Sequence, residues 1–222
     1  MKKLIAIIIV LVIILVGIVA YKKVAIATQE IKIEEVEKIE SYLGQIYMWQ
    51  EITNEALPAF EDINQADETW LWEVVKKNVE EYELTSEKIE TKAKEIFGEK
   101  FTKKFPKEGT MYLVPDEENQ IYYATGTGLD QEEDLFLLNK IEKTKTGYEV
   151  EIVEYLEDYS QIEEQGLIIV RDIEGKEIGR VSSSEEEKTK QLAKDNSEQL
   201  SKKRVILQEE KGKLVVEKVE KE

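Results

Sequence analysis

The stretch YEVEIVEYLE at residues 148–157 decides the fold, because its apolar and acidic residues alternate with the period of a β-strand. The apolar set is Tyr148, Val150, Ile152 and, after Val153, Tyr155, and the acidic set is Glu149, Glu151 and Glu154. Neighbouring side chains of a strand point to opposite faces of its sheet. The stretch therefore predicts a strand with one buried face and one acidic face in water.

Similar two-residue periods lie on both sides of this stretch. Pro, Asp and Gly residues separate them, as expected for turns, for example at Pro115–Asn119, Glu174-Gly175 and Gly212. The other strands that we expect are at residues 111–114, 121–124, 135–142, 166–171, 177–182, 204–208 and 214–218. The last four form two hairpins, and the whole set predicts antiparallel pairing.

Helical patterns precede most of the strands. We expect amphipathic helices at residues 28–51 and at 67–83, the latter with Asp67 or Thr69 as its N-cap. A third is expected from a cap at Thr85 or Ser86 to Phe97, with Gly98 as a C-cap or a kink. A surface helix is expected at residues 184–199, because serines and then acidic residues begin it and its apolar side is thin. Helices followed by antiparallel strands indicate an α+β fold with helices packed on a curved sheet.

The amino terminus carries a membrane-spanning pattern. Leu4 to Ala20 reads LIAIIIVLVIILVGIVA, which is apolar throughout and is flanked by Lys2-Lys3 and Lys22-Lys23. Spanning a bilayer takes about 20 residues, with a range of roughly 17–25. Tyr21 and the lysine stems lengthen the segment at its ends, so we expect residues 4–21 to contact the membrane. The sequence thus divides into an anchor at residues 1–23 and an acidic domain at residues 24–222.

A cleaved signal peptide is the alternative, because Ala25-Ile26-Ala27 matches a cleavage pattern. We favour an uncleaved anchor, since Lys22-Lys23 separates that pattern from an apolar run longer than the usual signal core. The lysines nearly balance across the segment. Because long domains translocate largely regardless of charge, we expect a cytoplasmic amino terminus and a domain outside the cell. The usage of Lys, Ile and Glu is typical of a low-GC, Gram-positive bacterium.

Composition excludes several functions. Among 222 residues, 31 are Lys or Arg and 48 are Asp or Glu, so the net charge is −17, and there is no His or Cys. The chain therefore has no Ser-His-Asp triad, no Cys nucleophile, no disulfide and no zinc site of the usual kind. Nucleic acid is not an expected partner, because phosphate binding needs a basic face. We predict no cofactor and no catalytic residue.

One acidic segment offers a candidate metal site. Asp130, Glu132 and Asp134 have the spacing of the first ligands of a calcium loop, and hard cations need only oxygen ligands. Leu135 stands where the loop needs glycine, and Ile141 stands where it needs glutamate, so the segment is not an EF-hand. A solvated acidic loop is the competing and favoured interpretation.

Other motifs have plain structural interpretations. Thr125–Gly128 is a turn rather than a phosphate loop, because acidic residues follow it. Pairs such as Glu117-Glu118, or Glu154 with Glu157, provide the residue types of a glycosidase, but a chain with this many carboxylates forms such pairs by chance. Trp70 and Trp72 are expected mainly in the core, with sugar stacking as the alternative. Ser182–Ser184 is a helix cap rather than a nucleophile.

The order of elements resembles the nuclear transport factor two-like, or cystatin-like, cone. The resemblance covers residues 30–220. It is carried by residues 87–105, as the last helix before the sheet, and by the strands from Met111 to Lys218. The closing strand pair, KRVILQEEKGKLVVEKV, is similar to the ends of membrane-anchored extracytoplasmic proteins of Firmicutes. The helix at 184–199 departs from that pattern. The resemblance implies a fold and a location, but not one function, because such cones serve as enzymes, binding modules and scaffolds.

We therefore expect a single-pass, membrane-anchored, extracytoplasmic binding domain that is not an enzyme. Its acidic surface suits a basic cell-surface protein, or a wall polymer with its cations. Two alternatives stay open. One is an enzyme that acts on glycans with carboxylates alone, and the other is a cytoplasm-facing membrane adaptor that uses the helix at 28–51.

Overall fold

The fold is a mixed α+β arrangement of helices and antiparallel sheets. A computed structural model describes residues 31–48, 55–118, 120–124 and 132–222. The helices are α2 (Ile33–Ile46), α3 (Glu68–Lys77), α4 (Ser86–Phe97), α5 (Ile162–Gln165) and α6 (Lys188–Asp195). The strands are β1 (Glu83–Leu84), β2 (Leu113–Asp116), β3 (Ile121–Ala124), β4 (Glu132–Lys143), β5 (Gly147–Asp158), β6 (Leu167–Arg171), β7 (Glu177–Ser182), β8 (Ser201–Glu210) and β9 (Lys213–Lys221).

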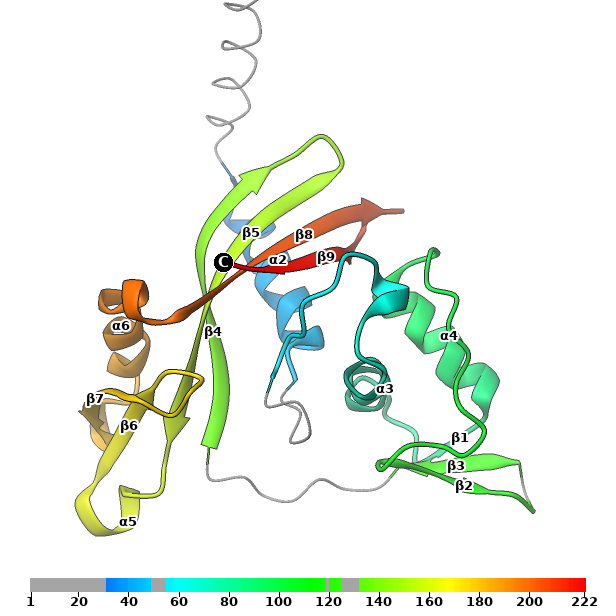
Figure 1. Ribbon diagram of the computed structural model, residues 1–222, viewed down its shortest axis with the longest axis horizontal. Helices are drawn as coiled ribbons and strands as arrows, with labels where there is room; N and C mark the ends of the chain where they lie inside the picture. The colour runs from blue at the N-terminus through cyan, green and yellow to red at the C-terminus, as the bar shows by residue number, and fades with distance from the viewer. Residues whose placement is uncertain (1–30, 49–54, 119, 125–131) are drawn as a thin grey trace, which may run out of the picture.

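Strand β5 organises the larger sheet. Its whole length pairs with β4 on one side, from Lys143 opposite Tyr148 to Glu132 opposite Asp158. On the other side its first part pairs with β8 and its last three residues pair with β6. The strand order is therefore β7-β6-β5-β8-β9 with β4 beside β5. Figure 1 shows that the long β4–β5 hairpin joins two ends of the sheet.

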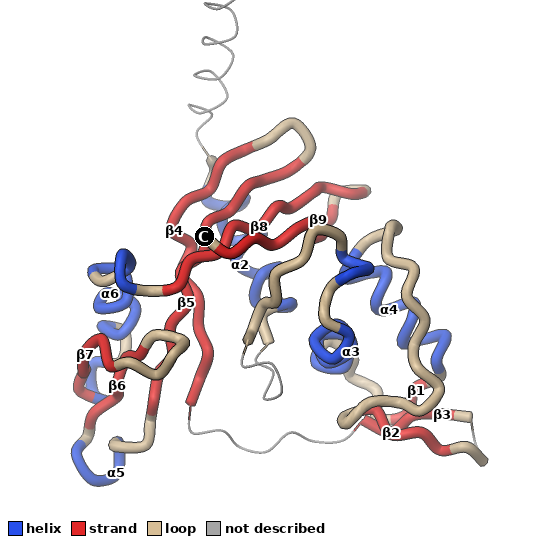
Figure 2. The backbone as a smooth tube through the Cα atoms, viewed as in Figure 1, coloured by secondary structure: helices blue, strands red, loops and turns tan. Residues whose placement is uncertain are grey.

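The main core lies between one face of β5, β8 and β9 and the helices α2, α3 and α4, which Figure 2 shows beside those strands. Val150 and Ile152 of β5 face this core, as the alternation in the sequence predicts. Tyr42 connects three elements from inside it: its hydroxyl donates to the Ile96 carbonyl and accepts from the Val216 amide. The core therefore depends on this tyrosine for polar contacts as well as for packing.

A smaller core lies on the opposite face of β5. Val153 and Tyr155 pack there with Val170 of β6. Ala193 of α6 and Leu200, directly before β8, complete this core. The run Ile152-Val153 is apolar on both faces because the helices cover one side of the strand and α6 covers the other. A strand that is buried on both faces loses its alternation.

A separate three-stranded sheet has the order β1-β3-β2. Leu84, Leu113 and Tyr122 point to its inner face and are buried in the main core. Residues that pair across the sheet share a face, so Glu83, Tyr123 and Val114 lie together on its outer face. Figure 1 places this sheet at the end of the molecule away from the start of α2.

Local signals set the helix boundaries. Asp67 accepts a hydrogen bond from the Trp70 amide, and Thr85 accepts one from the Lys88 amide, so both cap their helices as expected. Gly98 ends α4 with a φ of 90°, a left-handed angle that favours glycine. The sequence therefore predicted the N-terminal caps of α3 and α4 and the end of α4.

Several predicted boundaries were wrong. The helix expected at 67–83 stops at Lys77, because the Asn78 side chain bonds the Val74 carbonyl, and residues 83–84 form β1. The helix expected at 184–199 is reduced to α6 between the 3₁₀ turns Ser183–Glu185 and Ser197–Gln199, since few apolar residues hold it. Strand β2 includes Pro115 and Asp116, which were expected in a turn.

The helix expected at 28–51 is observed as α2 over residues 33–46, and Tyr47 and Met48 continue without helix. Residues 28–30 and 49–51 lie outside the described residues, as does the apolar segment at 4–20. In the described part of the chain, no helix combines the length and the hydropathy of a bilayer span. The predicted anchor thus lies outside what the structure describes.

Candidate functional site

A buried cluster of charges lies beside the main core. The Lys203 ammonium is 3.0 Å from a Glu154 carboxylate oxygen and 3.1 Å from one of Glu55. Lys203 and Glu154 are each 1% exposed. Lys203 also donates a hydrogen bond to the Leu57 carbonyl. Glu55 forms a second ion pair, with its carboxylate oxygen 2.9 Å from the Lys221 ammonium. Two carboxylates therefore share one completely buried lysine.

Strand register explains why these groups meet. Lys203 of β8 is opposite Ile152 of β5, and Ser201 is opposite Glu154, so both charged residues point to the helix-covered face. Tyr47, directly after α2, donates its hydroxyl to Glu154 at 3.3 Å. Ser201 donates to the other carboxylate oxygen at 3.3 Å. Each oxygen of Glu154 thus has a partner within the protein.

The two carboxylates respond differently to this environment. Burial raises the pKa of Glu154, although Lys203 attracts its charged form. At Glu55, burial opposes ionisation, but the hydrogen bonds and charges of Lys221 and Lys203 outweigh it and lower the pKa. A carboxyl with a raised pKa beside an ionised one is a pattern found in acid–base catalysis. Here every group of the pattern is engaged with its neighbours, as in a structural ion cluster.

Aromatic side chains fill the adjoining core. Trp70 lies 5.7 Å from Phe60 and 5.6 Å from Phe97, measured between ring centroids. Trp72 contacts Phe105 edge-on at 5.1 Å. Both tryptophans are completely buried, in agreement with the core role expected for them, so neither has a face on which a sugar could stack.

The candidate metal residues do not form one loop. Asp130 lies outside the described residues, and the backbone of Glu132 and Asp134 belongs to β4, opposite Asp158 and Leu156. The expectation of an acidic loop is therefore wrong at 132–134, because these residues extend the pairing of the β4–β5 hairpin. Within the described ranges, no group of three or more Asp or Glu side chains is placed to hold a metal ion.

Thr125–Gly128 lies outside the described residues, whereas the Glu154–Glu157 pair and the serine cap lie within them. Glu154 and Glu157 are three positions apart in β5, so they point to opposite faces and cannot act as an acid–base pair. Ser182 accepts a hydrogen bond from the Ser184 amide and caps the 3₁₀ turn at 183–185. The helix cap expected at Ser182–Ser184 was wrong for α6, because that helix begins at Lys188 and Glu187 makes no side-chain capping bond.

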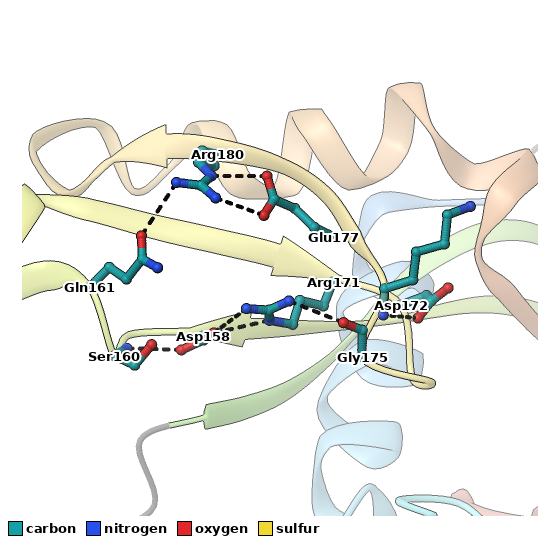
Figure 3. A network of polar contacts seen from close by, with 9 residues as sticks. Asp158, Ser160, Gln161, Arg171, Asp172, Gly175, Glu177 and Arg180 are labelled. Atoms are coloured by element: carbon teal, nitrogen blue, oxygen red, sulfur yellow. Dashed lines mark hydrogen bonds and ion pairs between the residues drawn. The ribbon is translucent and has the colours of Figure 1, made fainter.

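A second polar network fastens β5 to the β6–β7 hairpin (Figure 3). Arg171 donates to Asp158 at 2.8 and 3.0 Å and to the Gly175 carbonyl at 3.1 Å. Burial opposes ionisation of Asp158, but its hydrogen bonds with Ser160 and Arg171 lower the pKa. In the same hairpin Arg180 forms a two-pronged pair with Glu177. This network holds a turn in place and leaves no converging polar groups for a ligand among the residues that it joins.

The outer face of the β1–β3–β2 sheet carries exposed and half-buried apolar side chains beside acidic ones. We define the tyrosine face as Tyr82, Val114, Ile121 and Tyr123. Tyr82 is 65% exposed and Val114 is 42% exposed, and the Tyr82 and Tyr123 rings lie 5.4 Å apart. Asp116 accepts a hydrogen bond from the Tyr123 hydroxyl at 3.3 Å. Partial burial and this bond raise the pKa of Tyr123, which stays protonated at neutral pH.

Sequence reasoning missed this face because each strand is short. One signal could have found it: the chain has no Lys or Arg between Lys107 and Lys140, although 31 such residues occur overall. That interval contains eight acidic residues and three of the tyrosines. An apolar face in a segment without positive charge is a candidate for binding rather than for packing.

Comparisons with known proteins give no relative. No protein-family model, no curated protein and no solved structure matches this chain.

Proposed function

We propose that this chain is a single-pass, membrane-anchored binding protein whose acidic α+β domain lies outside the cell and docks a basic partner. The apolar run at residues 4–20 supports the anchor, and the lack of any charged residue within it supports a complete span. The three helices packed on one face of an antiparallel sheet support a nuclear transport factor two-like cone as the fold of the domain.

The distribution of charge is the observation that supports binding of a basic partner. Inside the fold, Lys203 pairs with Glu154 and Glu55, Lys221 also pairs with Glu55, and aromatic rings fill the adjoining space. The negative charge that is left over therefore lies at the surface, where it attracts cations and basic proteins. A basic surface protein of the cell envelope, or a wall polymer that carries cations, has the matching chemistry.

An enzyme that uses carboxylates alone is the competing proposal. The raised pKa of Glu154 favours it, because a general acid needs such a shift. The ion pair with Lys203 and the hydrogen bonds from Tyr47 and Ser201 argue for a structural role instead. Glu154→Gln separates the two: we expect it to lower the free energy of unfolding while binding of a basic partner is retained.

Fractionation tests the anchor and the binding separately. We expect the full chain to sediment with membranes and to resist a high-salt wash, and a chain that lacks residues 1–23 to remain in the supernatant. Retention of basic proteins on the immobilised full chain should fall as salt is raised, because salt screens surface charge. A chain that the salt wash strips from membranes contradicts the anchor, and retention that salt does not affect contradicts the electrostatic docking.

A further inference from the structure

We propose that the tyrosine face is the docking site for a lysine- or arginine-rich segment of a partner protein. This inference rests on the proposed function and names the surface and the partner chemistry. It starts from the geometry of the small sheet, whose inner side chains are buried in the core while its outer side chains reach water. Val114, Tyr123 and Glu83 form one row across the three strands.

The charge around the face points to a basic partner. Residues 78–87 and 108–124, which carry β1, β2 and β3, contain eight acidic residues and no Lys or Arg. Two bases from outside these segments contact them: the Lys88 ammonium lies 3.8 Å from a Glu81 carboxylate oxygen, and Lys76 lies over the Tyr112 ring. Complementary charge favours encounter with a cationic segment and disfavours an anionic one.

The tyrosines suit cationic side chains. An ammonium or guanidinium group is attracted to an aromatic face, more so beside a carboxylate. Lys76 already shows this contact within the chain, with its ammonium 5.7 Å from the centroid of the Tyr112 ring. Tyr82 and Tyr123 offer two adjoining rings, with Glu83 opposite Tyr123 in the sheet and Asp116 bound to its hydroxyl.

The partner docks on the face of the sheet rather than on its edge. Strand β2 is an outer strand, but the Leu113 amide and carbonyl both bond to Thr110. Pro115 has no amide hydrogen to donate. An extended chain would therefore find little backbone to pair with along β2, whereas the side chains of the face are open. Figure 1 places the β1–β3–β2 sheet at the end of the molecule away from the start of α2.

The test measures binding of a fluorescein-labelled polylysine peptide to the full chain in a non-ionic detergent, by fluorescence anisotropy. Tyr82→Ala should weaken binding about three-fold, as expected for an exposed cation–π contact, and Tyr82→Phe should restore it. The double variant Glu83→Gln with Glu117→Gln should weaken binding further and reduce its dependence on salt. Glu163→Gln with Glu164→Gln in α5 removes the same charge from exposed positions elsewhere and should leave binding within about two-fold.

Each outcome has one meaning. The expected ranking supports docking on the tyrosine face. Equal weakening by the two double variants, with no effect of Tyr82→Ala, shows that net charge alone attracts the peptide; this overturns the tyrosine face and leaves the basic partner of the proposed function standing. A wild-type chain that binds no polylysine at low salt overturns both.

Discussion

Lys203 and Glu154 form an ion pair of 3.0 Å in which both residues are 1% exposed. Removing two charges from water is costly, and mutual attraction repays that cost only when other polar contacts complete the arrangement. Glu55, Leu57 and Tyr47 supply such contacts. The pair joins β5 and β8 to the segment that follows α2, so it fixes how the helices sit on the sheet.

Lys203→Met should be strongly destabilising, because it leaves the buried Glu154 carboxylate without its cation and leaves Glu55 with Lys221 alone. We expect the free energy of unfolding in urea to fall by about 3–5 kcal/mol at neutral pH. Part of this loss should return on mild acidification, since Glu154 then becomes neutral. The double change Lys203→Met with Glu154→Leu should recover most of it. A loss below about 1 kcal/mol for the single change would show that the pair is not needed for stability.

The pairing of Glu35 predicts an acid-sensitive attachment of α2. Hydrogen bonds from Lys143 and Tyr148 lower the pKa of Glu35 from 4.5 to about 2, and burial together with Glu35 raises the pKa of Tyr148 to about 12. A carboxyl whose pKa is lower in the folded state contributes stability above its unfolded pKa, and this contribution is lost as the pH falls through the folded value.

Glu35→Gln should therefore reduce stability at neutral pH, and the curves of the variant and the wild type should converge between pH 4.5 and about 2. Urea midpoints measured across that range check this, with Glu34→Gln as a change of equal charge in the same turn. Parallel curves for the variant and the wild type would contradict the prediction.

Substitution by alanine should have opposite effects on stability at Gly147 and at Gly44. A Cβ at Gly147 would lie 2.1 Å from the Leu207 carbonyl oxygen, whereas a Cβ at Gly44 in α2 meets nothing within 4 Å. Gly147→Ala should cost about 1–3 kcal/mol through overpacking. Gly44→Ala should add about 0.5–1 kcal/mol, because alanine loses less entropy in a helix. Thermal unfolding of the two variants decides this, and a shift of equal sign would show that the β5–β8 approach is looser than described.

The Asp158–Arg171 pair should stabilise the β6–β7 hairpin locally. Arg171→Met leaves the nearly buried Asp158 carboxylate without its cation, at a cost of about 2 kcal/mol. Hydrogen exchange should then rise mainly in residues 167–182. Arg180→Met removes the same charge from the exposed pair with Glu177 and should have a clearly smaller effect. Similar exchange in both variants would mean that the buried pair has no special role.

The sequence predicted the fold best where one face of an element is buried. Val150 and Ile152 alternate with Glu149 and Glu151, and β5 follows that pattern until α6 covers its second face. Capping residues predicted where α3 and α4 begin, because the hydrogen bonds of a cap are local. The expectation of an α+β fold with antiparallel strands is thus confirmed.

Long-range contacts were beyond the sequence. No pattern in the sequence distinguishes Lys203 from the other lysines, because only the pairing of β8 with β5 brings it to Glu154. The tyrosine face likewise arises from three short strands, of which β1 and β2 are 29 residues apart in the sequence. Glu132 and Asp134 showed the reverse problem, since a spacing that suits a loop is also that of one face of a strand.

The location of the domain is the central claim, and the absence of cysteine makes it directly measurable. We would place a single cysteine at Glu174, an exposed residue of the β6–β7 turn, and in a second variant at Lys2. Intact cells are then treated with a membrane-impermeant maleimide. We predict labelling of Glu174→Cys in intact cells and of Lys2→Cys only after lysis. Labelling of Glu174→Cys only after lysis would contradict it and leave a cytoplasm-facing adaptor.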